Sequence, residues 1–174
     1  MQPRIQVVGQ DGNIITTNMI SEWSQCSVPE LSALLSHLRH LGIVHQTSHW
    51  TAKADVFYSD HLLFERLYSN VVAEIDVVAE RAVGIGTSKN VDVALQTAQV
   101  ARLSQMLNMV STIPQPNELA KKSLMAEMTF GAALNTVVSS LKQSNAMTRG
   151  IDNMLADIAD KHETHVYLLK QRCM

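Results

Sequence analysis

Four long stretches of this sequence carry apolar residues at helical spacing, and this pattern constrains the fold more than any other feature. They cover residues 28–53, 59–84, 118–146 and 152–171. In the first stretch Leu31, Leu34, Leu35 and Leu38 recur at intervals of three and four, so they share one face of a helix. Because the connections within each pair are short, the sequence predicts two antiparallel helix pairs.

The connection between the two pairs is long and contains a weaker helical stretch at residues 90–108, which STIPQPN at 111–117 interrupts. One long crossover between the second and third helices is typical of a ferritin-like bundle, whereas a cytokine-type bundle needs two. We therefore expect an all-α protein in which residues 27–174 form a ferritin-like four-helix bundle. A short extra helix is expected in the long crossover between helices two and three.

The first 26 residues do not share this pattern. IQVVGQDGNIITT places an Asp-Gly turn signal between two β-branched runs, which predicts an N-terminal arm or small hairpin over residues 1–26. An isolated hairpin is unstable in water, so this segment would have to pack on the body of the protein or on a neighbouring chain. The following SVPE, residues 27–30, is typical of a capping box at the start of the first helix.

Composition excludes several classes of protein. With 17% charged residues and a net charge of −2, the chain has neither the basic surface of a nucleic-acid binder nor an acidic tail. No apolar run approaches the roughly 18 residues that cross a bilayer, and the N-terminus does not resemble a secretory signal. We therefore expect a cytoplasmic protein, with Cys26 and Cys173 as unpaired thiols.

Metal-binding side chains gather on the first two predicted helices: His49, His61, Glu65, Asp76 and Glu80. Asp76 and Glu80 are four residues apart, so their carboxylates share one helix face. His61 and Asp76, by contrast, are fifteen residues apart, which is roughly 22 Å along a helix axis. Metal–ligand bonds are only about 2 Å long, so one chain cannot use both residues on the same ion.

The sequence therefore supplies two half-sites. His49, near the end of the first helix, can meet His61 at the start of the second, because a short loop makes the two helices antiparallel. The carboxylates lie far along the second helix. A two-fold dimer with antiparallel second helices would join the histidine end of one chain to the acidic end of the other, twice.

These residues match a known pattern. His49-Trp50, His61 twelve positions later, and Asp76-Val-Val-Ala-Glu80-Arg resemble the Dps family of mini-ferritins. PELSALLSHLRHLGIVHQTSHW and DKHETHVYLLKQ are similar to the first and last helices of that family, so the resemblance covers about residues 28–170. It implies a cytoplasmic shell of twelve subunits built from two-fold dimers. Such a shell oxidises Fe(II), typically with hydrogen peroxide, stores the ferric mineral and protects against oxidative damage.

The resemblance also implies roles for individual residues. His49 and His61 would bind iron from one chain, and Asp76 and Glu80 would bind it from the two-fold mate. Glu65 would bind a second, weaker iron. Trp50 matches an aromatic residue near the family's site, and His45 is either an extra ligand or a hydrogen-bonded neighbour. Imidazole and carboxylate ligands suit Fe(II) and Fe(III), although zinc, cobalt or manganese could occupy the same site.

Three other interpretations remain. A di-iron site inside each chain would use two Glu-x-x-His motifs, but none of the seven histidines has a glutamate three positions before it. A DNA-compacting protein would use a Lys/Arg-rich tail, yet the first 26 residues hold a single basic residue, Arg4; an electrophoretic shift at low salt tests this alternative. The third is a helical structural protein with a coincidental ligand pattern. Separately, His162, Glu163 and His165 resemble the last helix of the family, where such residues are commonly structural, with a surface or pore metal site as the alternative.

Overall fold

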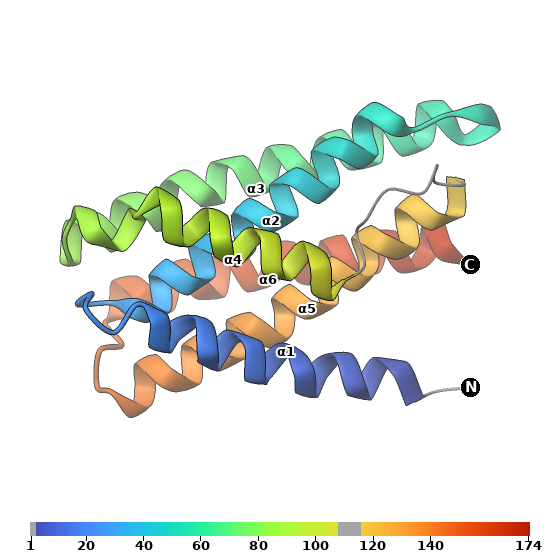
Figure 1. Ribbon diagram of the computed structural model, residues 1–174. Coiled ribbons are helices and arrows are strands. Elements are labelled where there is room, and N and C mark those ends of the chain that lie inside the picture. The colour runs from blue at the N-terminus through green and yellow to red at the C-terminus, as the bar shows by residue number, and fades with distance from the viewer. Residues whose placement is uncertain (1–2, 108–115) are drawn as a thin grey trace.

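The structure, a computed structural model, describes residues 3–107 and 116–174, with side chains from residue 13 onward except at residue 116. Six α-helices follow one another (Figure 1): α1 (Pro3–Glu22), α2 (Pro29–Thr51), α3 (Phe57–Ile85), α4 (Val93–Met106), α5 (Pro116–Gln143) and α6 (Arg149–Cys173). The short 3-10 helices η1 (Ala54–Val56) and η2 (Ser88–Val91) flank α3. The described residues contain no strand, so the all-α prediction is confirmed, and none of the described helices has the length and apolarity needed to cross a membrane.

Four of these helices enclose the main core. α2 packs on α3 and on α5, and α6 closes the ring through its contacts with α5 and α3. The aliphatic stripe that predicts α2 points inward, and Leu31, Leu34, Leu35 and Leu38 are completely buried. They meet side chains from the other three helices, among them Val71, Phe130, Val137 and Ile158. Burial of these stripes, at about 25 cal/mol per Å² of apolar surface, is the main force holding the helices together.

The start of α2 differs in detail from the capping-box prediction. Val28 occupies the N-cap position and Pro29 the first turn, but no side chain caps the helix. Glu30 instead accepts a hydrogen bond from the Ser140 hydroxyl of α5 at 2.8 Å. The residue that was expected to close the cap locally therefore ties two long helices together.

A tight turn ends α3. At Gly86 a Cβ atom would lie 2.4 Å from Asn90 Oδ1 and 2.7 Å from the Ala82 carbonyl oxygen, so only glycine fits this close approach. Asn90 is completely buried and donates to the Val28 carbonyl and to the Ser32 hydroxyl. The turn after α3 is therefore anchored to the first turn of α2.

The N-terminal prediction is wrong in its local structure. Residues expected to form an arm or small hairpin form the helix α1, and the Asp-Gly pair lies inside it. α1 packs on α5 and α2, and it buries Met19 and Thr16, with Trp23 just beyond its end. Tertiary packing of these side chains outweighs the β-branched and turn-forming residues of the segment.

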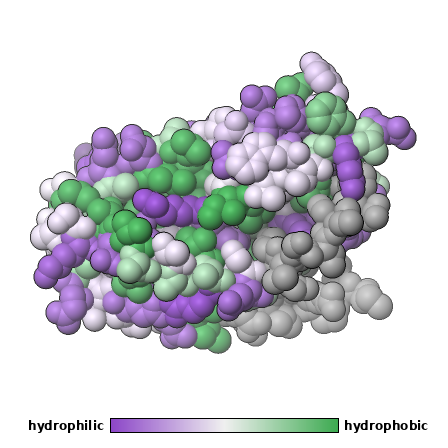
Figure 2. All heavy atoms as spheres, turned by 45° about the horizontal axis from the view of Figure 1, so that its top comes forward, coloured by the Kyte–Doolittle hydropathy of each residue, from purple (hydrophilic) through white to green (hydrophobic). Residues whose placement is uncertain are grey.

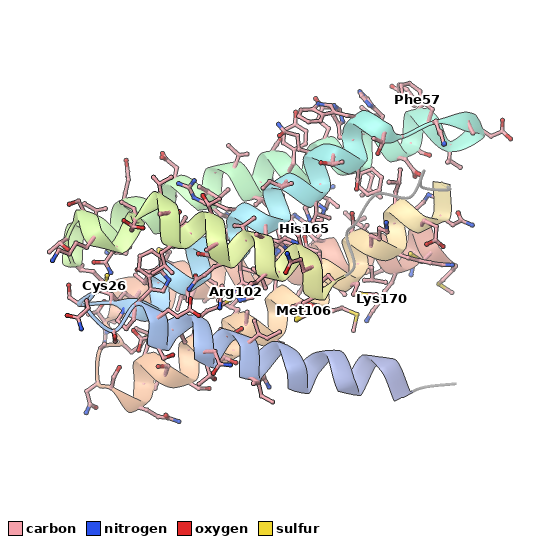
Figure 3. All side chains as sticks on the ribbon, viewed as in Figure 1. Cys26, Phe57, Arg102, Met106, His165 and Lys170 are labelled. Carbon is pink, nitrogen blue, oxygen red and sulfur yellow. The ribbon has the colours of Figure 1, made fainter. Side chains whose placement is uncertain are left out.

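α4 forms the expected helix in the long crossover and lies against α2. Its Gln99 accepts a hydrogen bond from Trp23 Nε1 at 3.0 Å, and Arg102 pairs with Glu22 at the end of α1. The predicted break at 111–117 falls almost entirely outside the described residues. Cys26 and Cys173 are unpaired, as expected. Cys26 lies at the end of the molecule opposite Phe57, where α3 begins (Figure 3).

Candidate metal centres

His49 and His61 come together at the α2–α3 end of the molecule, as their spacing predicts. The two imidazole rings stack with centroids 3.8 Å apart. His49 Nδ1 donates to the His61 carbonyl oxygen at 2.9 Å, and His61 Nδ1 donates to the His49 carbonyl oxygen at 3.1 Å. Tyr68 and Phe57 lie against the pair, with ring centroids 5.3 Å from His49 and 5.1 Å from His61 respectively.

These reciprocal hydrogen bonds fix the chemistry of both rings. A carbonyl oxygen only accepts, so each Nδ1 must carry the proton. In the neutral imidazole the lone pair is then on Nε2, which is the form that binds a metal ion. Metal-binding histidines commonly use the second ring nitrogen in this way to hold the ring and select the tautomer. The pair is therefore arranged as a two-nitrogen half-site.

The predicted acidic ligands do not join this pair within the chain. Glu65, Asp76 and Glu80 are all exposed on α3, and none makes a hydrogen bond or ion pair with another described residue. Asp76 lies roughly 22 Å from His61 along the axis of α3, because the two residues are fifteen positions apart and each position adds 1.5 Å. The single chain thus holds the predicted ligands as separate histidine and carboxylate groups.

Apolar side chains accompany both groups on the same face. Leu62, Val72 and Val77 of α3 are 44%, 52% and 50% exposed, and Trp50 at the end of α2 is 68% exposed. Figure 2 shows hydrophobic patches interleaved with hydrophilic side chains on the side of the molecule that carries α3. Several exposed aliphatic residues on one helix are typical of a surface that another protein covers.

His45, one helical turn before His49, faces the core instead of the histidine pair. It is completely buried and makes no described contact with His49 or His61. Its Nε2 lies 2.7 Å from Glu127 Oε1, and its Nδ1 lies 3.3 Å from the Ser123 hydroxyl. Both partners are on α5, on the inner side of the core.

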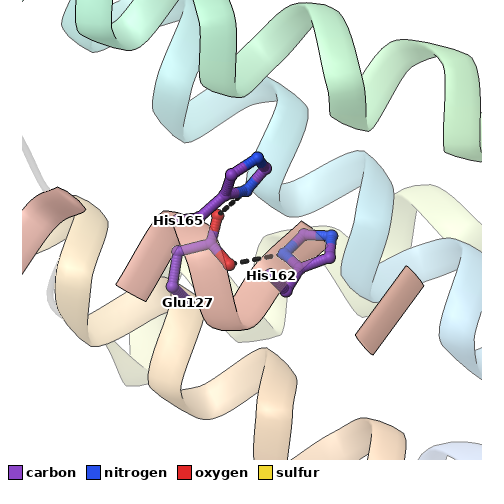
Figure 4. Close-up of side chains that lie close together, drawn as sticks. All are labelled: Glu127, His162 and His165. Atoms are coloured by element: carbon purple, nitrogen blue, oxygen red, sulfur yellow. Dashed lines mark hydrogen bonds and ion pairs between the residues drawn. The ribbon is translucent and has the colours of Figure 1, made fainter. Parts of the chain in front are cut away.

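Glu127 is the centre of a second group, which we call the buried cluster: His45, Glu74, Glu127, His162 and His165. Each of the four core helices contributes to it, and every member is at most 3% exposed. His162 Nδ1 lies 2.5 Å from Glu127 Oε2, and His165 Nδ1 lies 3.0 Å from Glu127 Oε1 (Figure 4). Three imidazoles therefore converge on one carboxylate.

The outward nitrogens of these rings also have partners. His162 Nε2 donates to Glu74 Oε2 at 2.8 Å, and His165 Nε2 lies 3.0 Å from Asn70 Nδ2. The remaining oxygen of Glu74 is buried without a hydrogen-bond partner among the described residues, and Lys161 Nζ approaches it only to 3.9 Å. Buried polar atoms rarely remain unsatisfied, because losing water without a replacement partner costs about 1–3 kcal/mol.

The electrostatics of the buried cluster follow from these contacts. Burial alone would raise the pKa of Glu127, but hydrogen bonds from His162, His165 and His45 hold it well below its usual range. Burial alone would lower the pKa of His162, but its bonds to Glu127 and Glu74 raise that pKa to about 9. Without a metal, His162 is therefore an imidazolium between two carboxylates.

The buried cluster forms a polar layer inside an apolar core. The large cluster around Leu34, Val78 and Phe130 lies on one side, and a smaller one built on Phe64, Leu67, Leu119 and Leu169 lies on the other. Along α3, α5 and α6 the buried cluster therefore lies between the two apolar clusters. Polar groups buried between such apolar layers are costly unless they are hydrogen-bonded, and most of these atoms bond to one another.

The Glu-x-x-His motif does not predict the buried cluster. His162 and His165 are on α6, whereas the two glutamates come from α3 and α5, so no Glu-x-x-His pair is formed. A carboxylate–histidine cluster inside one chain was nevertheless present. The signal available in the sequence is the position of Glu127, His162 and His165 on the faces that also carry core aliphatic residues.

Comparison with known proteins adds little to these observations. No family model matches the chain. An uncharacterized protein from Haemophilus influenzae (strain Rd) is 24% identical over 125 residues, which covers 72% of this chain and 74% of that protein. The similarity therefore extends over most of both chains and brings no functional description with it.

Proposed function

We propose that this protein is an iron-oxidising and iron-storing mini-ferritin with a ferritin-like four-helix bundle. His49 and His61 of one chain and Asp76 and Glu80 of a second copy would bind Fe(II) as substrate. The observation that carries the proposal is the reciprocal bonding of His49 and His61, which protonates both Nδ1 atoms and leaves both Nε2 lone pairs available. A stacked histidine pair that only stabilised the fold would not need both Nε2 lone pairs to be available.

The separation of the two half-sites supports a shared site. Helix geometry keeps Asp76 roughly 22 Å and Glu80 roughly 28 Å from His61 of their own chain. An isologous contact between two α3 helices brings each histidine pair to the partner's carboxylates, because two-fold symmetry forms the contact twice. The half-exposed Val72 and Val77, next to Asp76, supply apolar surface for such a contact.

The ligands suit oxidation of iron. Two imidazoles and two carboxylates, with no thiolate, match Fe(II) and the harder Fe(III) that replaces it, and they leave coordination positions open. Each of two Fe(II) ions loses one electron, and one hydrogen peroxide molecule takes up both electrons. Its O–O bond breaks and, with two protons, it yields two water molecules. Glu65, one turn after His61, is the candidate ligand for the second iron.

The other expectations from the resemblance belong to this proposal. We propose a shell of twelve chains built from two-fold dimers, located in the cytoplasm, with the ferric mineral inside. Zinc, cobalt or manganese would compete for the same ligands. The mass of the native assembly, measured with and without Fe(II) and peroxide, tests the shell directly.

A mixing experiment tests whether the site is shared. One variant carries His49→Ala and His61→Ala, and the other carries Asp76→Ala and Glu80→Ala. Each alone should lose iron-dependent peroxide consumption. When both chains are produced together, half of the dimers are mixed and each has one complete site, so about one quarter of the sites should be active.

Glu163→Ala provides a matched control, because Glu163 is an exposed carboxylate on α6, away from both half-sites. It should behave as the parent protein does. Inactive mixtures would overturn the shared site, and a parent protein that consumes no peroxide with Fe(II) would overturn the proposed function.

A further inference from the structure

The buried cluster contains a second group of ligand atoms, independent of the His49–His61 pair. One oxygen of Glu127 and one nitrogen each of His162 and His165 lie within 4.8 Å of one another. Around a tetrahedral ion with bonds of about 2.1 Å, neighbouring ligand atoms are about 3.4 Å apart. The three atoms would therefore approach one another by at most about 1.4 Å when they bind an ion. We propose that Glu127, His162 and His165 bind one divalent transition-metal ion in the core of each chain.

The first supporting observation is the orientation of the rings. His162 and His165 both point Nδ1 at Glu127. Replacing the shared protons with a metal ion keeps the same atoms facing one another. The cluster therefore already has the arrangement of a site around a central cation.

The outer partners provide a second and separate observation. Metal-binding imidazoles usually donate their other N–H to a carboxylate or a carbonyl oxygen. His162 Nε2 faces Glu74, which is 3% exposed. His165 Nε2 faces the side-chain amide of Asn70, and a half-turn of that amide places its oxygen there as an acceptor. Both ligands thus have the supporting group that a metal site needs.

The free oxygen of Glu74 is a third observation. It is buried and accepts no hydrogen bond from a described residue. With Glu127, it places a second carboxylate beside His162, and the Lys161 ammonium group approaches it only to 3.9 Å.

His45 completes the set as a candidate fourth ligand. Its Nε2 also points at Glu127 Oε1, at 2.7 Å, while its Nδ1 lies beside the Ser123 hydroxyl. Three imidazoles and one carboxylate, without a thiolate, favour zinc or iron(II) over soft copper(I) and over calcium or magnesium. Phe130, with its ring 4.2 Å from His162, and the apolar clusters on both sides leave no position for substrate. The site is therefore structural in character, with all ligands from one chain.

The experiment must remove the exposed site first. A variant with His49, His61, Asp76 and Glu80 all changed to alanine keeps the buried cluster intact. It is stripped of metal with a chelator and titrated with Co(II) alone, a spectroscopic substitute for zinc. We expect one Co(II) per chain, with the absorption bands of four-coordinate cobalt, and a higher midpoint of thermal unfolding. Absence of Co(II) binding to this folded variant overturns the proposal, whatever the outcome for peroxide consumption.

A second variant locates the ion. His165→Gln, added to the same background, should bind Co(II) at least tenfold more weakly, whereas Glu163→Gln, its exposed neighbour on α6, should bind as before. Circular dichroism establishes that His165→Gln remains helical. If it unfolds, Glu127→Gln, which keeps the shape of the side chain, replaces it. Unchanged Co(II) affinity in a folded variant of either kind overturns the proposal.

Discussion

The His49–His61 pair and the buried cluster differ in where their acidic partners lie and in how readily the sequence reveals them. The half-buried pair, His49 and His61, can be recognised from sequence spacing, but no described acidic side chain of the same chain bonds to it. The buried cluster around Glu127 has its acids and imidazoles in one chain, yet no local motif announces it. Under the proposed function the surface site depends on a second copy of the chain, whereas the buried cluster depends on the packing of four helices.

The comparison also separates function from stability. Exposed ligands such as Asp76 and Glu80 make no described contact, so the folded chain does not depend on them. Glu127, by contrast, is completely buried and accepts hydrogen bonds from three histidines. Substitutions in the two groups should therefore affect different measurements.

The largest expected effect is on folding. Glu127→Ala leaves three imidazoles without their acceptor and His162 with half of its balancing charge. We expect the free energy of unfolding to fall by about 3–5 kcal/mol, measured by urea denaturation followed by circular dichroism. Glu80→Ala should change it by no more than about 0.5 kcal/mol. A loss below about 1 kcal/mol for Glu127→Ala would remove the distinction between the two groups.

The pH dependence of the metal-free protein should show the buried histidines at work. The pKa of His162 is raised to about 9, so its stabilisation is complete below the ordinary value of 6.5 and is lost as the pH rises through 9. Burial lowers the pKa of His37 to about 3 and that of His40 to about 4. Because the unfolded chain then binds more protons, these two destabilise the fold as the pH falls below 6.5.

The free energy of unfolding should therefore peak near pH 6.5 by this linkage. Denaturation at a series of pH values measures the profile. His162→Gln should flatten its alkaline side and leave the slope between pH 6.5 and 4.5 unchanged, because His37 and His40 are untouched and Glu127 titrates only below 4.5. An alkaline side that is already flat in the parent protein contradicts the assignment of His162 as the imidazolium.

Substitution on the exposed face should weaken assembly without unfolding the chain. Val72→Asn with Val77→Asn removes apolar surface from both sides of the proposed two-fold contact. We expect the dimer to dissociate at least about tenfold more readily, as measured by analytical ultracentrifugation, with peroxide consumption falling in parallel. Val93→Asn, at an exposed valine of α4, is the matched control. Unchanged association would place the partner surface elsewhere.

The smallest expected effect concerns Glu65. This exposed carboxylate makes no described contact, so Glu65→Ala should alter the free energy of unfolding by less than about 0.5 kcal/mol. Initial rates of iron oxidation should fall less than they do for Asp76→Ala, since Glu65 is assigned only to the second iron. Equal losses in the two variants would make Glu65 a principal ligand.

The helices were predictable because their periodicity is strong, but the burial of polar residues was not. On α5 the apolar residues Leu119, Val137 and Leu141 are buried and Leu124, Met128 and Ala132 are half-buried, while Ser123 and Glu127 are also buried. Assigning the inner face by apolarity alone leaves a charged side chain outside. Glu127 is buried because three imidazoles satisfy it, and those imidazoles come from sequence positions 35 to 82 residues away.

The N-terminal segment shows the other limit. Its β-branched residues and Asp-Gly pair favour a hairpin locally, but Met19 and Trp23 are buried in the folded chain. Helix α1 therefore owes its form to contacts with α2, α4 and α5, which no local pattern reveals. The contact between His49 and His61 was predictable because it depends only on two antiparallel helices joined by a short loop.

The polar layer also bears on how the chain reaches a single alignment of its helices. Helices that touch only through aliphatic side chains can slip past one another by a turn, about 5.4 Å, and still bury hydrocarbon. Such a slip of α5 would move the Glu127 carboxylate from its imidazoles into the neighbouring aliphatic layer. An unpaired charge there costs several kcal/mol. The buried cluster therefore disfavours shifted alignments of the four helices during folding.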